Sequence, residues 1–73
     1  MMGTNKNQNV WHSPTEKPIY EEKEIIVEWE KYHDVGYYNK ETNMVEFAHY
    51  RDMPMTMVKK WAYMEDILDR TNE

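Results

Sequence analysis

The sequence contains no cysteine and only two glycines among its 73 residues. Without cysteine, the fold can have neither a disulfide framework nor a Cys-based zinc site, and thiol nucleophiles are excluded. Because the two glycines stand far apart, at positions 3 and 36, no glycine-rich phosphate-binding loop can form. The longest aliphatic run, residues 25–27, is far shorter than the roughly 20 residues of a transmembrane helix. We therefore expect no membrane partner.

Basic residues are also scarce. Nine lysines and arginines stand against 14 acidic residues, which gives a net charge of −5. Nucleic-acid binding normally depends on a basic surface that neutralises phosphates, so we expect no nucleic-acid partner. The three histidines, at positions 12, 33 and 49, lack the close spacing of a metal-binding motif. We therefore expect no metal and no cofactor.

Residues 1–9 are polar and lack the apolar segment of a signal peptide, which predicts a disordered tail and a cytoplasmic protein. Aromatic residues, in contrast, are abundant, with three Trp, six Tyr and one Phe. Disordered chains are poor in such rings, and rings are the most effective way for a short chain to bury apolar area. We predict one small folded domain over residues 10–70, followed by a frayed C-terminus over residues 71–73.

The pattern of side chains predicts a sheet. Residues 24–30 alternate with a period of two, which places Ile25, Val27 and Trp29 on the core side and Glu28 and Glu30 outside. A three-residue turn, residues 31–33, leads to a second strand over residues 34–39, in which Gly36 indicates a bulge or a ring packed closely above it. A polar loop over residues 39–43 then leads to a third strand.

The third strand is predicted over residues 44–50, with Val45 and Phe47 facing inward. The proline and methionines of residues 51–57 indicate a loop, and residues 58–64 form a fourth extended segment. Acidic residues precede a basic one in residues 65–70, which favours a helical turn. The predicted fold is α+β and mostly β: a three- to four-stranded antiparallel meander with a short C-terminal helix.

No residue pattern indicates catalysis. Glu28 and Glu30 could act as a pair of carboxylates only in a cleft, and so small a meander offers little material for one. We therefore predict a non-enzymatic domain that acts through protein contacts, as a monomer or weak homodimer. Tyrosine and methionine are typical of interfaces, and the sequence has more tyrosines than a core of this size requires. The possible partner surface consists of Tyr32, Tyr37, Tyr38, Tyr50, Met53, Met55 and Met57.

Two other hypotheses remain. Acidic side chains could imitate nucleic acid and occupy a basic site on a host protein, in which case the decoy surface would consist of Glu21, Glu22, Glu24, Glu28 and Glu30. Alternatively, the rings could form a stacking platform for single-stranded nucleic acid or carbohydrate. A decoy complex would weaken steeply with salt, whereas an interface of Tyr and Met would change little.

The order of landmark residues is similar to that of a known family. Trp11 precedes Ser13 and Pro18, an aliphatic strand begins at Ile25, and a Tyr37-Tyr38 strand precedes Trp61 and Met64. Over residues 11–68 the chain resembles the small phage and prophage proteins of the domain-of-unknown-function 551 family. The resemblance implies a β-meander and a mobile-element origin, and it implies no catalytic residue.

Overall fold

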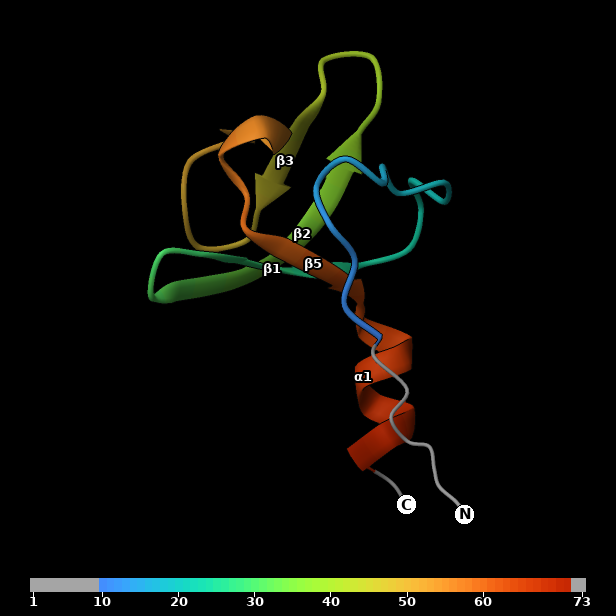
Figure 1. The fold of residues 1–73 in the computed structure, drawn as a ribbon. Helices are drawn as coiled ribbons and strands as arrows, with labels where there is room; N and C mark the ends of the chain where they lie inside the picture. The colour runs from blue at the N-terminus through green and yellow to red at the C-terminus, as the bar shows by residue number, and fades with distance from the viewer. Residues whose placement is uncertain (1–9, 72–73) are drawn as a thin grey trace.

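Residues 10–71 are described by the computed structural model, so the tail predicted for residues 1–9 and the last two residues lie outside the described part (Figure 1). Its elements are β1 (Ile25–Trp29), β2 (Tyr32–Asn39), β3 (Met44–Phe47), β4 (Met53–Pro54), η2 (Met55–Met57), β5 (Lys60–Tyr63) and α1 (Met64–Thr71). The strands form one antiparallel sheet in the order β4-β3-β2-β1-β5. The predicted α+β, mostly β fold is confirmed, with five strands rather than three or four.

Strand β1 lies inside the sheet and carries the centre of the core. Ile25, Val27 and Trp29 are all buried, as their alternation predicts. Val27 pairs with Trp61 of β5, and Ile25 pairs with Tyr63, so these side chains share one face of the sheet. We call this the inner face. The buried apolar side chains of the inner face form a single cluster. Strand β1 lies in the middle of this cluster, paired with β2 on one side and β5 on the other.

The turn between β1 and β2 is shorter than predicted. Trp29 pairs with Tyr32, so Glu30 and Lys31 alone make the turn, and the predicted start of β2 at Asp34 is two residues too late. Glu30 has a φ of 51°, a left-handed conformation that reverses the chain within two residues. Glu30 therefore belongs to the turn and does not share an outer strand face with Glu28.

Gly36 marks the closest approach between β2 and β3. It pairs with both Ile25 and Phe47 and is buried between them. A Cβ at this position would collide with the carbonyl oxygen of Glu46 and would lie 2.9 Å from the Phe47 Cα. The glycine is therefore required by the backbone of β3, and neither the predicted bulge nor a ring above it is the reason.

Strand β3 ends at Phe47, three residues before the predicted end. Val45 is buried and Phe47 packs against the core, which confirms the predicted inward face. Beyond Phe47, the Asp34 carboxylate accepts hydrogen bonds from the His49 backbone N at 2.9 Å and pairs with its Nδ1 at 3.0 Å. The Ala48 backbone N still donates to the Val35 carbonyl at 2.9 Å, and the contact of Asp34 with His49 then holds the chain beyond the end of β3.

The segment predicted as a loop over residues 51–57 contains β4 and η2. Met53 pairs with Val45, and the Met55 backbone N donates to the Asn43 carbonyl at 2.9 Å. Both methionines are buried, because this segment folds over the open end of the inner face. Pro54 lies in the edge strand β4, where a missing N–H costs no ladder hydrogen bond.

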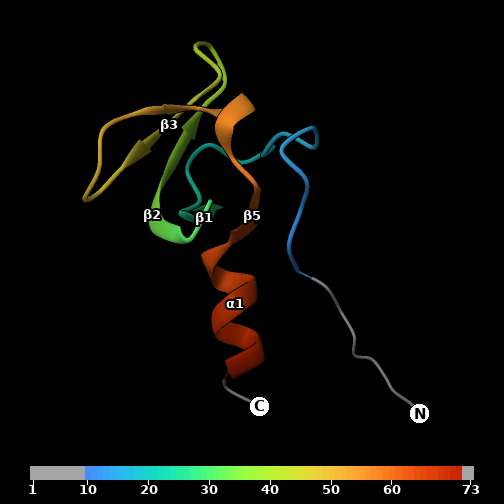
Figure 2. The same ribbon diagram turned by 60° about the vertical axis from the view of Figure 1, so that its left-hand side comes forward.

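Residues 10–23 cover the opposite part of the inner face, beside β5 (Figures 1 and 2). His12 forms an isolated antiparallel bridge with Trp61, and the Trp61 indole N–H donates to the carbonyls of Ser13 at 3.2 Å and Glu16 at 2.8 Å. Helix α1 follows β5 directly and extends away from the sheet in both views. None of the helices in the described residues is long and apolar enough to cross a membrane.

Candidate functional site

The predicted partner surface does not exist as one surface. Tyr38, Met53 and Met55 are only 5%, 6% and 0% exposed, so a partner cannot contact them in the folded domain. This part of the prediction is wrong because the short chain uses these side chains to fill its core. The Tyr38 hydroxyl also donates to Asn43 Oδ1 at 2.6 Å, which fixes the ring at the β2–β3 turn. Burial, and after it the charge of Glu21, raises the pKa of Tyr38.

The other predicted residues are exposed but lie in different places. Tyr37 pairs with Glu46, which places both side chains on the outer face of the sheet, away from the core. Tyr32 lies at the β1–β2 turn and Tyr50 in the β3–β4 connection, and these residues are 53% and 52% exposed. Met57 is 65% exposed in η2. Of the predicted set, Tyr32 and Tyr50 contact a common neighbour.

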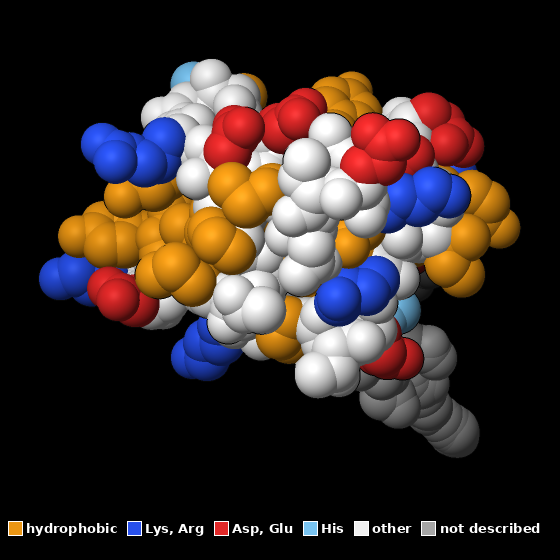
Figure 3. Space-filling view, turned by 90° about the horizontal axis from the view of Figure 1, so that it is seen from above, with side chains coloured by type: hydrophobic (Ala, Val, Ile, Leu, Met, Phe, Trp, Pro, Cys, Tyr) orange, Lys and Arg blue, Asp and Glu red, His pale blue; other side chains and the backbone are white. Residues whose placement is uncertain are grey.

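That neighbour is Trp29. Its ring centroid lies 5.2 Å from that of Tyr50, 6.2 Å from that of Tyr32 and 5.0 Å from that of Phe47. We call these four residues the aromatic cluster. Trp29 is buried, while Tyr32 and Tyr50 pack against it and are each about half exposed. Figure 3 shows hydrophobic side chains gathered at the end of the molecule where the β1–β2 turn lies, with Lys and Arg side chains around them.

A cleft of about 510 Å³ opens beside the aromatic cluster. Its lining residues are Trp29, Tyr32, His33, Asp34, His49 and Tyr50. The cleft therefore combines three rings of the cluster with one carboxylate and two imidazoles. Asp34 and His49 were not predicted as site residues, because they are 15 positions apart and only the tertiary fold brings them together.

Asp34 is a largely buried, hydrogen-bonded polar group in the cleft. Its side chain is only 10% exposed, and its oxygens accept hydrogen bonds from the Val35 backbone N at 2.8 Å and from two nitrogens of His49. Burial disfavours its charge, but the hydrogen bonds from His49 and Val35 outweigh burial and hold the pKa of the Asp34 carboxyl below its usual range. A negative charge therefore lines the cleft at neutral pH.

The same pair limits the chemistry that the cleft can perform. A carboxylate that orients an imidazole is part of several nucleophilic sites, but such sites also need an activated hydroxyl or thiol. No serine, threonine or cysteine lines this cleft within residues 10–71. His49 is itself 80% exposed, so water surrounds most of its ring. The geometry fits the binding of a side chain better than it fits catalysis.

The predicted decoy residues are also distributed over the molecule. Glu21, Glu22 and Glu24 precede β1, whereas Glu30 lies in the turn at its other end. Glu28 lies on the outer face and faces Lys60, with 3.7 Å between Oε1 and Nζ. The five carboxylates therefore do not form a continuous acidic strip along one strand.

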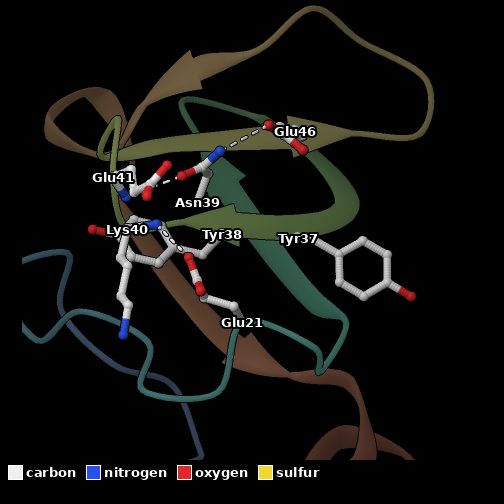
Figure 4. A pocket seen from close by; sticks show the side chains of 7 residues that line it. All are labelled: Glu21, Tyr37, Tyr38, Asn39, Lys40, Glu41 and Glu46. Carbon is white, nitrogen blue, oxygen red and sulfur yellow. Dashed lines mark hydrogen bonds between the residues drawn. The ribbon is translucent and has the colours of Figure 1, made fainter.

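A smaller group of carboxylates does converge at the β2–β3 turn, round a cleft of about 400 Å³. Figure 4 shows Glu21, Glu41 and Glu46 round this cleft, with Asn39 between the last two and the Tyr37 ring pointing away. Glu21 accepts a hydrogen bond from the Lys40 backbone N at 2.7 Å, and Asn39 Nδ2 donates to Glu46 at 3.3 Å. Glu41 and Glu46 were not predicted as part of this group, because they lie 20 and 25 residues from Glu21 along the chain.

The chain was compared with protein-family models, with curated proteins and with solved structures, and none of them matches it.

Proposed function

We propose that this domain is a non-enzymatic binding module that contacts a partner protein through the aromatic cluster. The observation that carries this proposal is the packing of two half-exposed tyrosines, Tyr32 and Tyr50, against the buried Trp29 ring. Tyrosine and tryptophan are enriched at the centres of protein interfaces, because a rigid ring buries a large area at a small entropic cost. The phage origin implied by the family resemblance and the cytoplasmic location remain predictions.

A capture experiment tests the proposal. The wild-type chain, a Tyr32→Ser/Tyr50→Ser double variant and a Tyr37→Ser control are immobilised and exposed to extract from host cells. Tyr37 is a matched control because it is a half-exposed tyrosine on the outer face. We expect at least one protein to bind the wild type and the control but not the double variant. Equal binding to all three, or binding to none while the chain is folded, would contradict the proposal.

The acidic decoy remains the second candidate, and the carboxylates in Figure 4 favour it. In that case the basic site of the partner would face Glu21, Glu41 and Glu46. Binding would then weaken steeply between about 50 and 200 mM salt, because exposed charges are screened over about 8–10 Å at physiological ionic strength. A Glu41→Gln/Glu46→Gln variant should lose such a partner, whereas the Tyr32→Ser/Tyr50→Ser variant should retain it.

A further inference from the structure

One lysine of the chain, Lys23, is held by two tyrosine rings and a carboxylate. Lys23 Nζ lies 4.4 Å from the ring centroid of Tyr20 and 5.8 Å from that of Tyr63. The same ammonium donates to Glu65 Oε2 at 2.8 Å. Two tyrosine rings and one carboxylate thus surround one cation, an arrangement in which ring quadrupoles and a full negative charge act together.

The cleft at the aromatic cluster presents the same kinds of group. Two half-exposed tyrosines, Tyr32 and Tyr50, pack against the Trp29 ring, and the Asp34 carboxylate belongs to the same lining. In the part of the chain that the structure describes, no Lys or Arg lines this cleft. The group that the chain itself places against Asp34 is the His49 imidazole, with 3.0 Å between Nδ1 and Oδ1, while the two tyrosine rings have no Lys or Arg of this lining against them.

We infer that this cleft receives a cationic side chain, a lysine or arginine, from a basic segment of the partner protein, with Tyr32 and Tyr50 against its flanks and Asp34 opposite its charge. The inference rests on the proposed function and specifies the chemistry of the partner. It also agrees with the net charge of −5, which attracts a basic partner at long range.

The local charges favour a cation over an anion. Asp34 is the only Asp, Glu, Lys or Arg in the lining, and its only ionisable partner among residues 10–71 is His49. Lys31 and Arg51 are exposed, and neither belongs to the lining of the cleft. An anionic group in the cleft would instead meet the Asp34 carboxylate at close range.

Peptide display tests the inference. Random peptides are selected on the full chain, and the bound peptides are located by the amide and indole NMR shifts of Trp29, Asp34 and His49. Each Lys in a cleft-binding peptide is then replaced by norleucine and each Arg by citrulline, which remove the charge and keep most of the shape. We expect one such position at which the neutral replacement weakens binding by about tenfold or more.

Protein variants provide the second arm. Asp34→Asn should weaken the cationic peptide by about tenfold and leave its neutral counterpart unchanged, and Tyr50→Leu should weaken the cationic peptide by about fivefold. Tyr37→Leu, the same kind of change outside the cleft, should alter binding less than about twofold. Because Asp34→Asn could loosen the His49 segment, its amide spectrum is compared with that of the wild type, and Tyr50→Leu tests the ring contact independently.

The outcomes separate the two proposals. Peptides that bind in the cleft but tolerate every neutral replacement would overturn the inference and leave the proposed function standing. The same holds if Asp34→Asn, folded as the wild type, binds the cationic peptide equally well. If no selected peptide shifts the cleft signals, both the inference and the proposed interface are wrong.

Discussion

Replacement of Gly36 by alanine tests the tightest contact in the sheet. The new Cβ would collide with the carbonyl oxygen of Glu46 and lie 2.9 Å from both the Glu46 carbonyl carbon and the Phe47 Cα. These are backbone atoms of β3, so no side-chain rotation can relieve the contact. Strand β3 would have to move away from β2, which would weaken their pairing and the packing of Phe47 above the core.

The size of the effect follows from two opposing contributions. Removing a glycine from a strand interior favours folding by about 0.5–1 kcal/mol, because the unfolded chain loses freedom. Overpacking typically costs about 1–3 kcal/mol, and a clash with backbone belongs at the upper end. We therefore expect a net loss of about 2 kcal/mol. A chain of this length has a free energy of unfolding of only about 4–11 kcal/mol, so the loss is easily measured.

Urea unfolding followed by tryptophan fluorescence measures this loss, and a thermal scan should show a Tm lower by about 8–16 °C. Tyr37→Phe is the control, because Tyr37 is the next residue in β2, points to the outer face and is half exposed. We expect the control to lie within about 0.5 kcal/mol of the wild type. A Gly36→Ala chain as stable as the control would refute the close approach of β2 and β3.

Three further predictions concern single groups. Trp61→Phe removes the indole N–H that donates to Glu16 and should cost about 1–3 kcal/mol of unfolding free energy, with faster proteolysis of residues 10–23. Tyr63→Phe removes the hydroxyl that accepts from the Ile19 backbone N at 3.0 Å, and should accelerate hydrogen exchange of that amide. The lowered pKa of Asp34 contributes stability at neutral pH that is lost as the pH falls below about 4, so the urea midpoint of Asp34→Asn should decrease less over that range.

Local pattern was sufficient where a strand had one buried face. The alternation in residues 24–30 correctly predicted the inward side of β1, because the period of two in a strand is independent of its partners. The inward positions Val45 and Phe47 followed from the same rule. The polar turn after β2 was also correct, and Asn43 adopts the left-handed conformation, with a φ of 58°.

The candidate site could not be predicted from local pattern in the same way. Tyr32 and Tyr50 were predicted as exposed tyrosines, but nothing in their spacing indicated that both would contact Trp29. Asp34 and His49 were not singled out as a pair, because their contact depends on the β2–β3 pairing and on where the chain leaves β3. Tertiary contacts of this kind are set by strand register, which no local pattern specifies.

By itself, the sequence determined that this is a folded, acidic domain rich in aromatic rings. It also determined which side chains of β1 and β3 face the core. It could do so because side-chain period and composition are properties of the chain alone. Only the tertiary structure decided which rings are core and which are surface. Met53 and Met55 are buried because a chain this short needs them to complete its core, whereas Tyr32 and Tyr50 pack against Trp29 and are half exposed.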